Sequence, residues 1–339
     1  MILVNKVINN YIKPIKINFN YILLLIMKNY ILLIKKNLLL FEYKNNTLIP
    51  FEKYDQYKHI GLNYPYMIIN NNLENDLIML AFDSKFRIQY KYDKTHYQES
   101  LNEKIKKLKQ ITNNYLVLIK NINRDIISPN YNLQKILSVI TLIIITTGIR
   151  VGKDYHFQQT KSKGLSTIQI EDVLVKQNII EINFIGKKQV KHKYIFKKED
   201  DKIIFDTLKY LYILNKENSC NFLFTFNNKK ITYIDINKYL KEKCNDDSVS
   251  NKDFRTLLSN IKYIECIKNY INEKKYNDLN FKKMFIHCNK FTADILHNTE
   301  SVAKKYYIFD IINNYIIDHF DDFIKIKDNY ILLNIILKE

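Results

Sequence analysis

At residues 136–146 the chain reads Ile-Leu-Ser-Val-Ile-Thr-Leu-Ile-Ile-Ile-Thr, and it continues at 147–153 with Thr-Gly-Ile-Arg-Val-Gly-Lys. The first run carries no charged side chain, so it predicts a buried element that delivers the polar turn after it to the protein surface. Its β-branched residues leave both a helix and a strand open for this element.

Glycines gather in the region that follows. The sequence has 339 residues but only five glycines, well below the average usage of ~7%. Four of them lie between Thr147 and Lys187, namely Gly148, Gly152, Gly164 and Gly186. This clustering indicates special backbone angles or a close approach to a ligand, although ordinary tight turns would also explain it.

The later segments show clear periodicity. Residues 165–196 predict three strands, with alternation at Ile180, Ile182 and Phe184 and a hairpin turn at Gly186-Lys187. Beyond residue 200 helical periodicity is found at 231–244, 281–296 and 300–325. A further helix is predicted to start at Ser250 and Asp253, which form a capping pattern, and Arg255 would lie beside its apolar stripe.

The N-terminal half has strand character, and all four prolines occur by Pro129, which leaves the rest free to form long helices. We predict an α+β fold: a small antiparallel β-rich domain at 39–101, and a larger, mostly α-helical catalytic domain at 102–339 that carries a small three-stranded sheet. Residues 1–38 form an apolar and basic extension outside both domains. Its longest uncharged run is too short to span a bilayer, and a peripheral membrane helix or a translation start at Met27 stays open.

The composition limits the partners and cofactors. Lysine and arginine number 53 against 35 aspartates and glutamates, and the net charge of +18 suggests nucleic acid or an anionic membrane as partner. Coding bias in AT-rich DNA would also raise the lysine content. The four cysteines lie far apart and lack metal-ligand spacing, so we expect reduced thiols and no zinc site. No Gly-x-x-x-x-Gly-Lys loop occurs, so ATP dependence is not indicated.

Five side chains together have the chemistry to cleave a phosphodiester: the phenol of Tyr306 as the nucleophile, and four groups that can supply positive charge, namely His297, Arg150, Lys187 and Arg255. A phenol with a reference pKa of ~10 is almost fully protonated at neutral pH. It therefore attacks phosphorus only where fixed positive charge favours its ionised form. The two arginines, the lysine and the histidine could supply that charge.

The same residues stand in an ordered set of motifs: Ile-Arg-x-Gly-Lys at 149–153, Phe-Ile-Gly-Lys at 184–187, Lys-Asp-Phe-Arg-Thr at 252–256, then His297 and Tyr306. In this order and spacing the chain, from about Leu38 to its C-terminus, resembles the poxvirus-type type IB DNA topoisomerases, small relatives of the tyrosine recombinases.

The resemblance implies a role for each residue of the set. Tyr306 would attack the scissile phosphate and become a 3′-phosphotyrosine. Arg150 and Arg255 would hold the non-bridging oxygens, which guanidinium forks match in geometry. His297 would donate a further hydrogen bond to these oxygens, and Lys187 would protonate the leaving 5′-oxygen.

The resemblance also implies DNA contacts. Asp-Ser-Lys-Phe-Arg-Ile-Gln-Tyr-Lys-Tyr at 83–92 is similar to the family's DNA-contacting strand. By that likeness Gln89, Tyr90 and Tyr92 would contact the major groove. An ordinary sheet with two core tyrosines is the alternative. Lys153 and Lys252 are further candidate DNA-binding residues, with solvated surface charges as the alternative.

Three positions depart from the family pattern. Leu296 stands where a glycine usually precedes the active-site histidine. Lys188 replaces a common acidic residue, which makes Lys187 and Lys188 alternatives for the same role. Tyr307 adjoins Tyr306, and neighbouring helical residues point about 100° apart, so only one can face the phosphate. The spacing from the histidine favours Tyr306.

The function that the resemblance implies is ATP-independent relaxation of supercoiled DNA by transient single-strand cleavage and religation. It implies duplex DNA as partner, no required ATP or metal, no membrane partner, a monomer, and a location in the host cytoplasm and the virion. One alternative is a tyrosine recombinase or integrase, although such enzymes usually have His where Lys252 precedes Arg255 by three residues. Another is a non-catalytic DNA-binding or packaging protein.

Overall fold

The computed structural model describes residues 30–36, 39–44, 47–52, 64–70, 77–83, 87–274 and 279–339. The chain divides into two compact units, Met1–Glu103 and Lys104–Glu339. Helix α4 (Lys94–Asn113) begins in the first unit and ends in the second. Within the part of the chain that the structure describes, no helix is both long and apolar enough to span a membrane.

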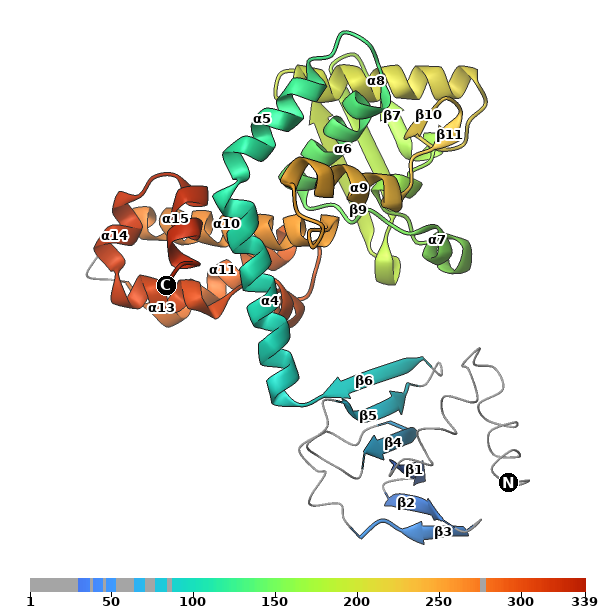
Figure 1. Cartoon of the computed structure of the whole chain (residues 1–339), viewed down its shortest axis with the longest axis vertical. Coiled ribbons are helices and arrows are strands. Elements are labelled where there is room, and N and C mark those ends of the chain that lie inside the picture. The colour runs from blue at the N-terminus through green and yellow to red at the C-terminus, as the bar shows by residue number, and fades with distance from the viewer. Residues whose placement is uncertain are drawn as a thin grey trace. The chain divides into compact units, whose positions relative to one another are not determined.

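The first unit contains a six-stranded antiparallel sheet (Figure 1). In spatial order its strands are β3 (Thr47–Pro50), β2 (Leu39–Lys44), β1 (Tyr30–Lys36), β4 (Tyr66–Asn70), β5 (Leu77–Phe82) and β6 (Ile88–Tyr92). The central strands bury side chains on both faces, with Met67 and Met79 in one cluster and Ile68 and Leu80 in the other. The sheet therefore has a core on each side.

Strand β1 lies inside the segment that the sequence assigned to an extension. It pairs with β2 on one side and with β4 on the other. The length of an uncharged run in residues 1–38 decides whether it can span a bilayer, but it does not predict strand pairing. The pairing of Ile31 with Ile69 and of Leu33 with Met67 makes β1 part of the sheet. The start site at Met27 and the membrane helix concern residues outside the described ranges.

The second unit is built around two buried helices, α6 (Leu133–Thr147) and α10 (Asn251–Glu273). Helix α6 packs against α5 (Tyr115–Ile126), α8 (Lys202–Glu217), α9 (Tyr233–Cys244) and α10. Because these neighbours surround it, apolar residues are buried on every side of α6, which explains its lack of a polar face. The helix, not the strand, is the correct reading of 136–146.

A three-stranded antiparallel sheet carries the predicted hairpin. Its strands are β7 (Val173–Val175), β8 (Ile179–Ile185) and β9 (Lys191–Lys197), and α8 packs against β8 and β9. The first predicted strand is shorter than expected, because two 3₁₀ turns at Leu165–Thr167 and Ile170–Asp172 precede it. A short helix, α7 (Asp154–Thr160), and a two-stranded sheet of β10 (Thr225–Phe226) and β11 (Lys229–Lys230) flank these elements.

The C-terminal part is helical. Helix α10 starts at the predicted capping box, where the Asp253 carboxylate accepts hydrogen bonds from the backbone N–H and the hydroxyl of Ser250. Helix α11 (Phe281–Ile295) follows. The helical pattern at 300–325 is not one helix but three, α12 (Glu300–Tyr306), α13 (Asp310–Asp318) and α14 (Phe320–Lys325), before α15 (Asn329–Ile336). The predicted α+β fold class is confirmed.

Candidate active site

The turn after α6 depends on a left-handed glycine. Gly148 ends the helix with φ +62, and its N–H donates to the carbonyl of Ile144. A Cβ at this position would lie 2.9 Å from a methyl carbon of Leu258 on α10. Glycine therefore suits the turn for two reasons, its backbone angles and the close packing of α10.

The backbone of Arg150 is held by the segment around Gly164. The N–H of Leu165 donates to the carbonyl of Arg150 at 2.8 Å, and the N–H of Ser166 donates to the carbonyl of Val151 at 2.7 Å. A Cβ at position 164 would lie only 2.6 Å from the carbonyl oxygen of Arg150. The glycines thus allow two backbone segments to pair closely and fix where the arginine side chain starts.

Arg255 links three parts of the second unit. Its side chain is only 4% exposed, and its two terminal nitrogens donate to the carbonyls of Gly148 and Leu296. Its Nε atom is buried without a partner. Burial lowers the pKa of Arg255, and the nearby charge of Arg150 lowers it further. Two arginine charges held close together are unfavourable until an anion joins them.

No carboxylate within the described ranges forms an ion pair with Arg150 or Arg255. Arg150 instead donates from Nη2 to the side-chain oxygen of Asn298 at 2.7 Å. The amide nitrogen of Asn298 is buried and has no partner. Unpaired donors on Arg255 and Asn298 beside two positive charges form a site suited to a phosphate group.

Arg150, Arg255 and Asn298 form what we call the arginine cluster. His297 lies beside it and has an unusual backbone conformation. Its φ of +48 is the left-handed conformation that favours glycine. The edge of its ring faces His192, with centroids 4.5 Å apart. Burial lowers the pKa of His297, and the charges of Arg255 and Arg150 lower it further. The ring is therefore neutral at physiological pH.

The left-handed residue changes how the motif is matched. The family glycine was expected at Leu296, but the position with glycine-like backbone is His297. The residue after it, Asn298, is the one bonded to Arg150. Tyr307 follows Asn298 by nine residues, the same spacing as from His297 to Tyr306. The motif can therefore be matched one residue later, with Asn298 in place of His297 and Tyr307 in place of Tyr306.

Of the two neighbouring tyrosines, the structure brings Tyr307 to the arginines. The guanidinium carbon of Arg255 lies 5.4 Å from the centre of the Tyr307 ring. Burial would raise the pKa of the Tyr307 phenol, but the charges of Arg255 and Arg150 and a hydrogen bond from Arg255 lower it overall. Tyr306 is 44% exposed, and its ring lies beside the amino groups of Lys104 and Lys305.

The two hairpin lysines lie on the turn between β8 and β9. Lys187 and Lys188 are both exposed, and Lys188 has a φ of +63. Among the described residues neither amino group has a hydrogen bond or ion pair. The structure thus leaves the choice between them open.

The predicted DNA-contacting residues of the first unit lie on β6, the edge strand of the sheet. Tyr90 is 51% exposed, and Tyr92 stacks on His96 with centroids 4.1 Å apart. Gln89 lies within 3.5 Å of the Asp83 carboxylate. Because side chains alternate along a strand, Gln89 faces the opposite side of the sheet from the two tyrosines.

The two predicted DNA-binding lysines of the second unit are exposed. Lys153 directly precedes α7, and its amino group lies 5.0 Å from the centre of the Tyr233 ring. Lys252 is in the first turn of α10, and its charge acts on Tyr307.

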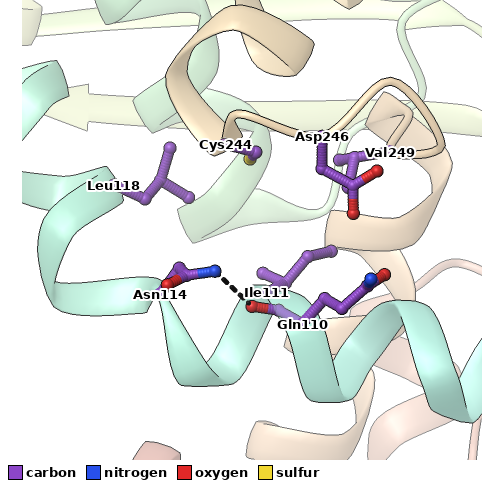
Figure 2. Close-up of a pocket in the computed structure, with 7 residues that line it drawn as sticks. All are labelled: Gln110, Ile111, Asn114, Leu118, Cys244, Asp246 and Val249. Atoms are coloured by element: carbon purple, nitrogen blue, oxygen red, sulfur yellow. Dashed lines mark hydrogen bonds between the residues drawn. The ribbon is translucent and has the colours of Figure 1, made fainter.

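A separate cavity lies between the α4–α5 junction and the loop after α9, near Gln110, Asn114, Cys244 and Asp246 (Figure 2). At about 10 Å³ it has room for a single water molecule. None of the residues that line it belongs to the arginine cluster, so it is not the candidate active site. All four cysteines are free thiols, and the described ranges contain no group of three or more potential metal ligands.

Two residues that the structure brings to the candidate active site, Asn298 and His192, are not among those predicted from the sequence. The spacing from His297 favours Tyr306, whereas Tyr307 is the tyrosine beside Arg255. The absence of a glycine at Leu296 is the sequence feature that could have indicated this. A left-handed residue at 297 in place of that glycine matches the motif to Asn298 and Tyr307.

Comparison with known proteins gives the family of the chain. A family model described as the eukaryotic DNA topoisomerase I catalytic core matches residues 84–322, more than half of the chain. The chain therefore belongs to the DNA topoisomerase I family.

Viral relatives narrow the assignment. The chain is 29% identical over 237 residues to DNA topoisomerase 1B of Acanthamoeba polyphaga mimivirus, which covers 68% of this chain and 69% of that protein. It is 25% identical over 267 residues to DNA topoisomerase 1 of Rabbit fibroma virus (strain Kasza), covering 75% and 80%. DNA topoisomerase 1B of Vaccinia virus (strain Copenhagen) is 26% identical over 240 residues, covering 68% and 70%. The family predicted from the sequence motifs is confirmed: the enzyme is a poxvirus-type type IB DNA topoisomerase.

Proposed function

We propose that the enzyme relaxes supercoiled duplex DNA by cutting one strand with Tyr307 as the nucleophile. The Tyr307 oxygen attacks the scissile phosphorus, the bond to the 5′-oxygen breaks, and a 3′-phosphotyrosyl linkage forms. After the free strand has rotated, the 5′-hydroxyl attacks the same phosphorus and releases the tyrosine. Because the covalent linkage retains the free energy of the broken bond, the cycle needs no ATP.

Arg150, Arg255 and Asn298 would hold the non-bridging oxygens of that phosphate. The unpaired Nε of Arg255 and amide nitrogen of Asn298 are the donors that lack a partner in the free enzyme. Asn298 would take the role that the family resemblance implies for His297, whose ring contacts His192 instead. Fixed cations around the phosphate do the charge stabilisation that bound metals perform in other nucleases, so we propose that no metal is required.

A lysine of the β8–β9 turn would protonate the leaving 5′-oxygen. Lys187 remains our candidate because it directly follows Gly186, as in the predicted motif. Lys188 is its alternative. An exposed amine on a turn can act as a general acid once bound DNA desolvates it and lowers its pKa.

The observation that carries this proposal is the position of the Tyr307 ring. The ring lies beside the guanidinium of Arg255, and the charges of Arg255 and Arg150, which no described carboxylate neutralises, lower the pKa of the phenol. A core tyrosine would have its pKa raised, as burial does for Tyr263. A lowered pKa favours the phenolate, which is the attacking species.

The test uses supercoiled plasmid with purified enzyme in EDTA and no nucleotide. Relaxed topoisomers are expected from the wild type. Tyr307→Phe should give neither relaxation nor a covalent adduct, whereas Tyr306→Phe should form the adduct. An adduct that survives in Tyr307→Phe and disappears in Tyr306→Phe would return the role to Tyr306. A linkage to the 5′ end of the cut strand would overturn the mechanism.

We propose further that the enzyme acts as a monomer on duplex DNA, in the host cytoplasm and the virion. The monomer is supported by the fact that the arginines, Asn298 and Tyr307 all come from one compact unit of one chain. Analytical ultracentrifugation of the enzyme on a short duplex tests it, since one protein per duplex is expected. The location is supported by the relatives in poxviruses.

A further inference from the structure

His192 occupies a position that the proposed reaction does not yet use. It lies on β9 opposite Phe184 of β8, and its ring stacks on the Phe184 ring with centroids 5.0 Å apart. Only 6% of the residue is exposed. Burial lowers the pKa of His192 to about 4, with further contributions from His297 and the two arginines. The ring is therefore neutral during catalysis at neutral pH.

One edge of the His192 ring lies on the backbone of the hairpin turn. A Cβ at Gly186 would be 2.6 Å from both Cδ2 and Nε2 of His192, so the ring leaves no room for any side chain there. Gly186 closes the turn by donating its N–H to the carbonyl of Val190 at 2.8 Å. The next residue is Lys187, so the His192 ring supports the backbone from which that lysine extends.

The His192 ring also contacts a residue beside the two arginines. The His297 ring contacts it edge-on, with centroids 4.5 Å apart and planes at 74°. His297 directly follows Leu296, whose carbonyl accepts a hydrogen bond from Arg255. The His192 ring thus contacts both the lysine turn and the segment whose carbonyl binds Arg255.

We propose that His192 is a positioning residue that fixes the distance between the lysine turn and the arginine cluster. The inference rests on the proposed function, in which a lysine of that turn is the general acid. Removing the ring would leave a gap between Gly186 and His297, and the turn could then move toward it. A misplacement of ~1 Å can slow a reaction ~10²-fold, so the loss should appear in the proton-transfer step.

The experiment compares two suicide substrates, one with the natural 5′-oxygen at the scissile phosphate and one with a 5′-bridging sulfur. With oxygen, the P–O bond breaks as the lysine gives its proton to the leaving oxygen. With sulfur, the P–S bond breaks and the thiolate leaves without a proton, because thiols are much more acidic than alcohols. A defect confined to the general acid therefore disappears with the sulfur substrate.

Single-turnover adduct formation is measured for His192→Ala, His192→Phe and the exposed control His287→Ala. His192→Ala should be ~10–10²-fold slower on oxygen and should approach the wild-type rate on sulfur. His192→Phe keeps a flat ring in the gap and should restore most of the lost rate on oxygen. A His192→Ala variant that is fast on oxygen, or equally slow on both substrates, would overturn the proposal. So would a His192→Phe variant as slow as His192→Ala.

Three reference variants show whether a negative result rules out the role of His192 or the proposed catalytic function itself. Tyr307→Phe should form no adduct with either substrate. Lys187→Ala and Lys188→Ala identify the general acid, since the variant that is slow on oxygen and restored by sulfur lacks it. If sulfur restores neither lysine variant, the general-acid assignment fails. If it restores a lysine variant but not His192→Ala, only the role of His192 fails.

Discussion

Tyr306 and Tyr307 are adjacent in the chain but have different surroundings. Helix α12 ends at Tyr306, and Tyr307 follows with the non-helical angles φ −127 and ψ −33. The last helical residue points into solvent, while the residue after it turns toward the arginines. The sequence could say that only one ring faces the phosphate, but not at which residue the helix ends.

The arginine that holds the site together should be the most sensitive residue of the cluster besides the tyrosine. We expect Arg255→Ala to slow adduct formation ~10²–10³-fold, because it removes a fixed donor and positive charge from the transition state. Single-turnover cleavage below the thermal midpoint of the variant measures this. Arg124→Ala on α5 is the control of equal charge. Equal rates for the two variants would contradict the assignment.

Substitutions at 297 and 298 test which residue donates to the phosphate. Asn298→Ala should slow adduct formation ~10²-fold, as expected for the loss of one oxyanion donor. Asn298→His restores a donor and should recover part of that rate. His297→Gly keeps the left-handed backbone and should have the smaller effect. A larger defect in His297→Gly than in Asn298→Ala would return the role to the histidine.

His192 should make the free energy of unfolding fall as the pH is lowered below neutrality. Its pKa is about 4 in the folded enzyme and ~6.5 in an unfolded chain. Between these values the unfolded state binds a proton that the folded state does not, so stability falls as pH drops from about 6.5 to about 4. His192→Phe removes this contribution, and its thermal midpoint should vary less over that range. Parallel curves for the two proteins would contradict the shift.

Helix α10 also holds the backbone of Tyr307. The hydroxyl of Ser259 and the amide nitrogen of Asn260 both donate to the carbonyl of Tyr307, at 2.7 and 2.8 Å. The Asn260 oxygen accepts from the N–H of Phe309 at 3.0 Å. One helix therefore carries Arg255 and also fixes the backbone that follows α12.

Loss of this support should affect both folding and cleavage. Asn260→Ala leaves the buried N–H of Phe309 without its partner, which costs ~1–3 kcal/mol of unfolding free energy. Urea unfolding measures the loss, and single-turnover cleavage should slow because the Tyr307 backbone is less well held. Asn218→Ala, at the exposed end of α8, is the matched control. Unchanged stability in Asn260→Ala would show that these hydrogen bonds contribute little.

The net charge of +18 should make DNA binding salt-dependent. The logarithm of the binding constant should fall linearly with the logarithm of salt concentration, by ~0.9 for each phosphate contact. Lys153→Ala should reduce this slope by ~1 if the lysine contacts a phosphate. Lys209→Ala on α8 removes the same charge and should leave the slope nearly unchanged. Equal slopes for the two variants would remove Lys153 from the DNA contacts.

The fold class, the hairpin and the family could be predicted from the sequence, because they depend on local periodicity and on motifs in a fixed order. The helices were predicted only in part, since both a helix and a strand stayed open for 136–146, and 300–325 forms three helices. The two arginines follow a turn and a helix cap whose residues are explicit in the sequence, and the structure bonds Arg150 to Asn298 and Arg255 to the carbonyls of Gly148 and Leu296. Their catalytic roles stay a prediction.

Three features could be seen only in the folded protein: β1 joins the sheet, Asn298 and Tyr307 lie beside the arginines, and His192 contacts both Gly186 and His297. These outcomes depend on strand pairing and on the residue at which a helix ends. A shift of one residue redirects a side chain completely, while it changes the sequence pattern very little.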